Sequence, residues 1–334
     1  MADPLLSVRN LRLEIATRRG PLLALDDVSF DIAPGEVLGV VGESGAGKSI
    51  TGTAIIGLLD PPLRMTGGEI AFAGQRIDNL SAEAFRLLRG RSIGAVFQDP
   101  LTSLNPLLTV GRQLVQTMRV HLDISPAAAR SRAVELLAEV GIPAPTERLD
   151  CYPHELSGGM RQRIVLALAF CCEPRLIIAD EPTTALDVSV QAQVIELLRR
   201  MCRERSTAVM LITHDMGVIA ETADRIAVMY AGRVVEIGPA TAVLKGPVHP
   251  YTRGLMASIP SMKRRTADLV QVEGSMPRLA EIPSGCAFHP RCPVRLPHCD
   301  CQRPSLMNAG DTLVACWLAA HGNVAPTRET IGHA

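Results

Sequence analysis

An eight-residue stretch that follows a short apolar run limits the fold of this chain more tightly than any other feature. The stretch reads Gly-Glu-Ser-Gly-Ala-Gly-Lys-Ser at 42–49 and fits the pattern G-x-x-x-x-G-K-[S/T]. The apolar residues 37–41 predict a strand before it, and residues 48–59 predict a helix after it. A glycine-rich turn between a strand and a helix binds phosphate, because backbone N–H groups in the turn and at the helix N-terminus attract anions.

The same stretch predicts the groups that contact a nucleoside triphosphate. We expect Lys48 to reach the β- and γ-phosphates and the Ser49 hydroxyl to bind Mg²⁺. The nucleotide contacts come from the turn and the first helical turn, at Gly42, Ser44, Gly45, Ala46, Gly47, Lys48, Ser49 and Ile50. ATP and Mg²⁺ are therefore the expected cofactors.

A pair of acidic residues supplies the second half of such a site. Residues 176–181, Leu-Ile-Ile-Ala-Asp-Glu, predict an apolar strand with two carboxylates at its carboxyl end, where α/β sheets bind ligands. We expect Asp180 to hold Mg²⁺, directly or through water, and Glu181 to act as general base on the attacking water. On its own, an acidic pair after a strand more often begins a helix, so this interpretation depends on the phosphate-binding stretch in the same chain.

Charge and hydropathy exclude several classes of protein. Lys plus Arg and Asp plus Glu number 34 each, and aromatic residues make up 3% of the 334 residues. A chain with this composition has no excess positive charge to bind the phosphate backbone and few aromatic side chains to stack on bases. No nucleic-acid partner is therefore expected. No apolar run approaches 18 residues and the first residues do not resemble a secretion signal. We expect a cytosolic chain that contacts a membrane only through partners.

The order of apolar segments predicts an α/β fold. Strand-like residues at 93–97, 176–179 and 208–212 alternate with helical stretches, which favours a mostly parallel sheet covered by helices. Residues 109–140 predict two helices separated near Pro126. After about residue 240 proline becomes dense, and we expect a small loop-rich C-terminal domain at 255–320 and a flexible tail at 321–334.

A second glycine-rich helix start distinguishes among the many ATPases with a phosphate-binding stretch. Residues 156–163, Leu-Ser-Gly-Gly-Met-Arg-Gln-Arg, resemble the signature LSGGQ of ABC (ATP-binding cassette) proteins, with Met160 in place of glutamine. This departure affects a side-chain contact and leaves the backbone turn intact. The resemblance implies a head-to-tail dimer, in which Ser157, Gly158 and Gly159 bind the nucleotide held by the partner subunit.

The other motifs of that family follow in order. Gln98 resembles the Q-loop glutamine, which senses Mg²⁺ and water and faces the membrane partner; residues 185–187, ending in Asp187, resemble the D-loop; and His214 resembles the switch histidine that contacts the γ-phosphate. The resemblance thus implies Gln98, Glu181 and His214 as catalytic residues and Ser49, Gln98 and Asp180 as the Mg²⁺ site. It also implies a P-loop NTPase fold of the ABC type over 1–254, with a RecA-like core, an antiparallel β subdomain and a helical subdomain at about 99–160.

The family usually stacks an aromatic side chain on adenine, and this chain has none between residues 9 and 27. We expect an apolar contact from Ile15 or a neighbour instead. The motifs therefore predict phosphate binding, while no residue of this stretch predicts selectivity for ATP over GTP.

Three longer stretches indicate the kind of ABC machine. Residues 97–106, 152–155 and 249–255 resemble the ATP-binding subunits of dipeptide, oligopeptide and nickel importers. The resemblance implies a second ATPase subunit in a heterodimer, with a homodimer as the alternative. It also implies two membrane permease subunits and an extracytoplasmic substrate-binding protein. It places the chain at the cytoplasmic face of the inner membrane. A soluble ABC ATPase that acts on nucleic acid or ribosomes, and a subunit that binds ATP without hydrolysing it, are the alternatives.

Five of the nine cysteines lie between residues 286 and 316. Cys286, Cys292, Cys299 and Cys316 are separated by 5, 6 and 16 residues, whereas structural zinc sites favour closer pairs. Four thiolates on loops suit a [4Fe–4S] cluster. The resemblance to peptide-importer subunits implies the same, because some of them carry such a cluster in their C-terminal extension. Cys301 is a substitute for the fourth ligand, and zinc or metal-free thiols are the alternatives.

Overall fold

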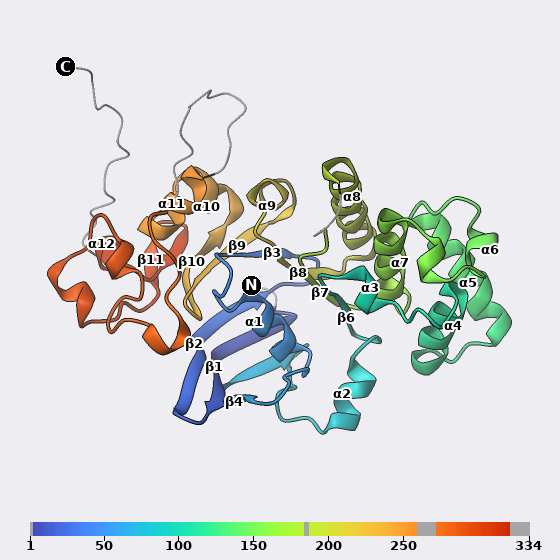
Figure 1. The fold of residues 1–334 in the computed structure, drawn as a ribbon, viewed down its shortest axis with the longest axis horizontal. Helices are drawn as coiled ribbons and strands as arrows, with labels where there is room; N and C mark the ends of the chain where they lie inside the picture. The colour runs from blue at the N-terminus through green and yellow to red at the C-terminus, as the bar shows by residue number, and fades with distance from the viewer. Residues whose placement is uncertain (1–2, 184–186, 259–271, 321–334) are drawn as a thin grey trace, which may run out of the picture.

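A computed structural model describes residues 3–183, 187–258 and 272–320 of the chain. It contains a smaller and a larger β-sheet, with helices around the larger one and a mostly helical part at one end (Figure 1). The smaller sheet is antiparallel, in the order β2-β1-β4-β5. Its strands are β1 (Leu6–Thr17), β2 (Gly20–Ile32), β4 (Leu63–Phe72) and β5 (Gln75–Arg76).

The larger sheet has eight strands in the order β11-β12-β10-β9-β3-β8-β7-β6. The strands from β6 to β9 in this order are parallel, and the others pair antiparallel. The parallel strands are β6 (Ile93–Val96), β7 (Leu176–Asp180), β8 (Ala208–Ile212), β3 (Val37–Val41) and β9 (Arg225–Tyr230). The antiparallel strands are β10 (Arg233–Pro239), β12 (Thr312–Val314) and β11 (Met307–Ala309). The predicted α/β fold with a mostly parallel sheet is confirmed.

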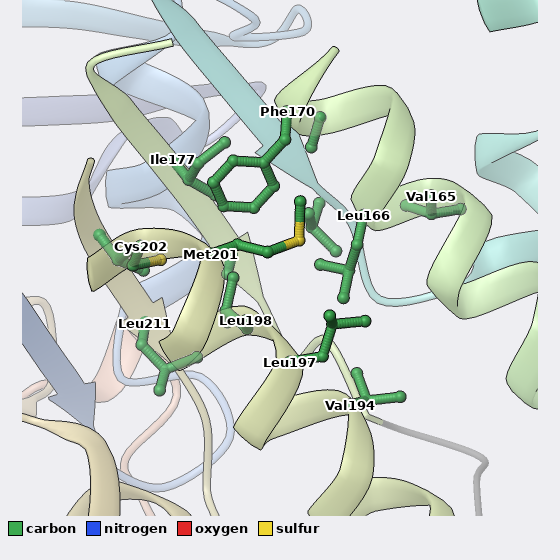
Figure 2. Packing of buried hydrophobic residues seen from close by; sticks show 14 of the residues in the cluster. Val165, Leu166, Phe170, Ile177, Val194, Leu197, Leu198, Met201, Cys202 and Leu211 are labelled. Carbon is green, nitrogen blue, oxygen red and sulfur yellow. The ribbon is translucent and has the colours of Figure 1, made fainter. Parts of the chain in front are cut away.

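Each face of the larger sheet contributes to a different hydrophobic core. Leu38, Val40 and Met210 pack with the smaller sheet and with α1 (Lys48–Ile55). On the other face, α7 (Gly158–Phe170), α8 (Val188–Arg205) and α9 (Met216–Thr222) cover the strands. Figure 2 shows Phe170 of α7 beside Ile177 of β7, with Met201 of α8 next to them. These cores hold the carboxyl ends of the parallel strands in fixed positions.

The helical part of the chain matches its predicted division near Pro126. The helix α4 (Val110–His121) begins where the Thr109 hydroxyl accepts a hydrogen bond from the backbone N–H of Arg112. The helix α5 (Pro126–Glu139) has Ser125 in the same capping role. The remaining helices of this part are short: α3 (Pro100–Ser103), α6 (Pro145–Arg148) and η1 (Pro153–Glu155). The helix α2 (Ala82–Leu88) instead packs through Phe85 against the core of the smaller sheet.

The C-terminal part of the chain adds to the larger sheet. In β10, Glu236 pairs with Val314 and Ile237 with Leu313 of β12, and Phe288 belongs to the same core as α7 and α8. The short elements of this part are α10 (Ala240–Lys245), α11 (Pro250–Ala257), η2 (Leu279–Glu281), η3 (His289–Arg291), η4 (Pro297–Asp300) and α12 (Trp317–Ala320). The predicted boundary after residue 254 stays a prediction, and the predicted tail at 321–334 lies outside the described residues.

Among the helices of the described residues, none combines the length and the apolar character that crossing a membrane requires.

Candidate functional site

The phosphate loop, residues 42–47, connects β3 to α1 as predicted. Its first residue, Gly42, has a φ of 152°, and a Cβ atom at this position would lie 2.3 Å from the backbone oxygen of Met229. Only glycine allows the loop to approach β9 this closely. Ser44 and Gly45 at the top of the loop are exposed, while Ala46 is fully buried beneath it.

Lys48, the first residue of α1, is folded over the loop. Its Nζ atom donates hydrogen bonds to the backbone oxygens of Gly42 (2.8 Å) and Glu43 (3.0 Å), and the residue is only 7% exposed. Burial lowers the pKa of the Lys48 ammonium from its usual value. The nearby carboxylates of Glu181 and Asp180 act in the opposite direction and favour the charged form. The Lys48 ammonium group therefore places a positive charge beside the loop.

Ser49 and Asp180 lie together, although they are 131 positions apart in the sequence. The Ser49 hydroxyl donates a 3.0 Å hydrogen bond to Oδ1 of Asp180, at the carboxyl end of β7. Burial raises the pKa of Asp180, and the Glu181 carboxylate adds to the rise, while the Ser49 hydrogen bond opposes it. A hydroxyl and a carboxylate are oxygen ligands of the type that Mg²⁺ uses together with water and substrate phosphates.

Glu181 lies between the other two predicted catalytic side chains. Gln98, after β6, donates from Nε2 to Oε2 of Glu181 at 3.1 Å, and Nδ1 of His214, after β8, lies 3.1 Å from Oε1. The Glu181 side chain is 19% exposed and His214 69% exposed. Glu181 has a φ of 47°, an uncommon conformation for a residue other than glycine and one that often occurs at functional sites. Three neighbouring strands thus bring the predicted base and its two partners together.

The signature residues do not join this group within the chain. Ser157 caps α7 by accepting a hydrogen bond from the backbone N–H of Met160, and both Ser157 and Gly158 are exposed. Gly159 follows in the first turn of α7. Among the hydrogen bonds of the described residues, none connects 157–159 to 42–49. Met160 packs against the core formed by α7 and α8, which accounts for an apolar residue at this position.

The remaining predicted nucleotide contacts are less well defined. Asp187 is exposed at the start of α8, and the rest of its motif, Ala185 and Leu186, lies outside the described residues. Ile50 and Ile15 are both half-buried and pack against the core beneath the smaller sheet. Their roles as nucleotide contacts stay predictions.

The predicted cysteine ligands do line one small cavity, of about 20 Å³, at Cys286, Cys292, Cys299 and Cys316. Burial raises the pKa of Cys286 to about 11, and the three neighbouring thiols add to the rise. Cys301 is exposed, does not line this cavity and points its sulfur toward the backbone oxygen of His298. In the described part of the chain, no three His, Cys, Asp or Glu side chains lie close enough to hold a single metal ion.

Sequence reasoning missed two residues that adjoin the phosphate loop. Tyr251 and Arg291, both from the C-terminal part, contact Glu43 within the loop. Arg291 is 248 positions from Glu43, and no short-range pattern in a single sequence indicates a pair at this separation.

Comparison with known proteins identifies the family. Residues 25–184 match a family model described as ABC transporter, and residues 235–299 match one described as oligopeptide/dipeptide transporter, C-terminal region. The chain is 48% identical over 318 residues to the dipeptide transport ATP-binding protein DppD of Bacillus subtilis, covering 95% of each chain. It is 45% identical over 316 residues to the oligopeptide transport ATP-binding protein OppD of Salmonella typhimurium, covering 95% of this chain and 94% of that one.

A solved structure supports the fold. The dimeric ATP-binding cassette MJ0796 bound to ADP and Pi superposes with a TM-score of 0.64 at 28% identity, covering 70% of this chain and 98% of that one. The ABC cassette fold expected from the motifs is therefore confirmed. The chain belongs to the ABC transporter family, among its oligopeptide/dipeptide transport ATP-binding proteins.

Proposed function

We propose that this ATPase is a subunit of an ABC importer that couples ATP binding and hydrolysis to the uptake of di- or oligopeptides. The observation that carries the proposal is the position of Glu181, held between Gln98 and His214 beside Lys48 and the pair formed by Ser49 and Asp180. The class of cargo comes from the names of the relatives, which are a dipeptide transport and an oligopeptide transport ATP-binding protein.

The proposed chemistry assigns one task to each group. Lys48 binds the β- and γ-phosphates, and Glu181 accepts the proton of the water that attacks the γ-phosphate, which releases ADP and phosphate. His214 donates a hydrogen bond to the γ-phosphate, and Gln98 orients the attacking water. Ser49, Gln98 and Asp180 would hold Mg²⁺, which when bound would supply positive charge beside the phosphate oxygens.

The proposed site is completed by a second subunit. Ser157 and Gly158 are exposed and have no hydrogen bond to the phosphate loop of their own chain, which supports a role toward the partner's nucleotide together with Gly159 and Asp187. ATP would then hold two subunits together through its γ-phosphate, and hydrolysis would release them. We propose a heterodimer, and a homodimer is the alternative outcome.

We propose two membrane permease subunits and an extracytoplasmic substrate-binding protein as further partners, with this chain at the cytoplasmic face of the membrane. The proposed organisation is a cassette at 1–254 with a helical subdomain at about 99–160, a C-terminal domain at 255–320 and a flexible tail at 321–334. The C-terminal family model matches residues 235–299, which supports a C-terminal domain of the oligopeptide/dipeptide transporter type after the cassette.

We propose that Cys286, Cys292, Cys299 and Cys316 hold a [4Fe–4S] cluster in this extension. All four cysteines line one cavity, which supports the proposal. A zinc ion needs its sulfur ligands about 2.3 Å away, and no three such side chains in the described part of the chain lie close enough for a single ion. When bound, such a cluster would tie together the loops that carry the four thiolates. The exposed Cys301 fits this role less well than the four.

Iron analysis with visible absorbance of protein purified without oxygen tests the cysteine site. We expect Cys286→Ser to lose iron and absorbance and Cys301→Ser to keep both. Stoichiometric zinc, or protein free of metal with all thiols reduced, would contradict the cluster.

Transport by the assembled complex tests the proposed function. We expect ATP-dependent accumulation of labelled dipeptides and oligopeptides in vesicles that contain the chain and its co-purified membrane subunits, and no accumulation with Glu181→Gln. Accumulation of nickel without peptides would contradict the proposed cargo. Co-purification with ribosomes or nucleic acid, and without membrane subunits, would contradict the proposed role as an importer.

A further inference from the structure

Two residues of the C-terminal part hold the second residue of the phosphate loop, Glu43. Nη1 of Arg291 donates hydrogen bonds to Oε1 and Oε2 of Glu43 at 3.0 and 3.1 Å. The Tyr251 hydroxyl accepts a hydrogen bond from the backbone N–H of Glu43 at 2.9 Å. Both the side chain and the backbone of one loop residue are therefore fixed from outside the loop.

The Arg291 side chain is itself firmly anchored. It is 8% exposed, and it donates from Nε to the backbone oxygen of Glu273 (2.8 Å) and from Nη2 to those of Val272 (3.2 Å) and Gly274 (3.3 Å). Its guanidinium group also lies 5.8 Å from the centre of the Tyr230 ring. A guanidinium with this many partners has one orientation, so it can fix the position of the carboxylate that it binds.

Tyr251 is fixed by ring packing. It is fully buried in α11, with its ring centre 4.7 Å from that of Tyr230 in an edge-to-face arrangement and 5.4 Å from that of Phe288. Burial raises the pKa of its hydroxyl, which therefore stays protonated at neutral pH. The hydroxyl oxygen remains available to accept the hydrogen bond from Glu43.

The position of Glu43 makes this support relevant to nucleotide binding. Its backbone oxygen accepts a hydrogen bond from Nζ of Lys48, and its carboxylate lies near enough to favour the charged form of that ammonium group. A negative charge in the phosphate loop opposes the binding of a triphosphate unless another charge balances it. Arg291 supplies that balancing charge. Because the Arg291 side chain is 8% exposed and the Glu43 side chain 28% exposed, salt screens this pair less than it would screen an exposed ion pair.

We propose that Arg291 and Tyr251 are positioning residues for the ATP site, which hold the phosphate loop through Glu43 and neutralise its carboxylate. Nucleotide affinity then depends on the C-terminal part of the chain, because both residues act through Glu43. The inference rests on the proposed role of residues 42–49 in phosphate binding.

Equilibrium binding of Mg–ATP to the full-length chain, and steady-state hydrolysis by the chain with its partner subunits, test the inference. We expect Arg291→Ala to raise the Kd and the KM for ATP about tenfold, because a charge-assisted hydrogen bond is lost and Glu43 is left without a balancing charge. The kcat should change less than about twofold, since Glu181 and His214 are not affected.

Three further variants separate the electrostatic from the positional effect. Arg291→Lys restores the charge without the planar fork and should recover part of the affinity. Glu43→Gln in the Arg291→Ala background removes the unbalanced charge and should bring the Kd to within about threefold of the wild-type value. Tyr251→Phe keeps the ring packing, loses the acceptor of the Glu43 N–H group and should raise the Kd about threefold.

Arg278→Ala is the matched control, because Arg278 is exposed in the same part of the chain and takes part in none of the side-chain hydrogen bonds or ion pairs found among the described residues. A lower melting temperature with unchanged Kd and KM for Arg291→Ala would overturn the inference and leave Arg291 a structural residue. If Arg291→Ala does not fold, an unchanged Kd for both Tyr251→Phe and Arg291→Lys would overturn it equally. Normal binding by Lys48→Ala would instead contradict the proposed function.

Discussion

Gly42 is the position at which a single methyl group tests the geometry of the phosphate loop most directly. A Cβ atom there would lie 2.3 Å from the backbone oxygen of Met229 and 3.1 Å from Cβ of Ala46. A side-chain rotation cannot relieve a clash with backbone, so the loop or β9 must shift, at a cost of about 1–3 kcal/mol for overpacking. The positive φ of 152° adds about 1–3 kcal/mol for any other residue. We therefore expect Gly42→Ala to lower the free energy of unfolding by about 2–6 kcal/mol.

Gly45 is the matched control in the same loop. It has a φ of 85°, but no atom lies within 4 Å of a Cβ placed there, so Gly45→Ala should cost only about 1–2 kcal/mol of backbone strain. The unfolding entropy of a chain of 334 residues is about 0.7 kcal/mol/K. Thermal melts without nucleotide should therefore show losses of about 3–9 °C for Gly42→Ala and about 1–3 °C for Gly45→Ala. A loss for Gly45→Ala as large as that for Gly42→Ala would refute this reasoning.

Three other changes have defined outcomes. Ser157→Ala removes the cap of α7 and should lower the free energy of unfolding by about 1 kcal/mol. If Ser157 contacts the partner's phosphate, hydrolysis by the assembled subunits should also fall about a hundredfold. A decrease in hydrolysis that the lost stability alone accounts for would contradict that contact. Asp180→Asn should have a higher melting temperature than wild type at neutral pH without Mg²⁺, because burial raises the pKa of Asp180 and disfavours its ionised form. The difference in melting temperature should shrink as the pH falls through that pKa. A difference that grows as the pH falls would contradict this reasoning. Phe170→Ala should lower the urea-unfolding free energy by about 3–5 kcal/mol, because Phe170 is fully buried between α7 and β7; a loss below about 1 kcal/mol would contradict this packing.

Much of the fold could be predicted from local patterns. The strands β3, β6, β7 and β8 and the break between α4 and α5 lie where apolar runs and Pro126 predicted them. The helix predicted at 48–59 ends earlier, at Ile55, because Gly57 takes a positive φ just beyond it. A glycine after a helical run is a recognisable stop signal, so this boundary could have been read from the sequence.

The long-range contacts could not be predicted in this way. The sequence predicted Gln98, Glu181 and His214 as one site only through the order of family motifs, whereas the fold brings them together because β6, β7 and β8 are neighbours in the sheet. The pairing of β12 with β10 and the contact of Arg291 with Glu43 depend on where a proline-rich segment returns to the cassette. Such a segment has no periodicity that fixes its path.

Hydrolysis by the Glu181→Gln variant, assembled with its partner subunits and saturated with Mg–ATP, tests the central claim most directly. Glutamine keeps the size of the side chain but cannot accept the proton of the attacking water. The account predicts that hydrolysis at this site falls by at least about a hundredfold while ATP remains bound and the ATPase subunits remain associated. Undiminished hydrolysis by this variant would show that another group is the base and would contradict the account.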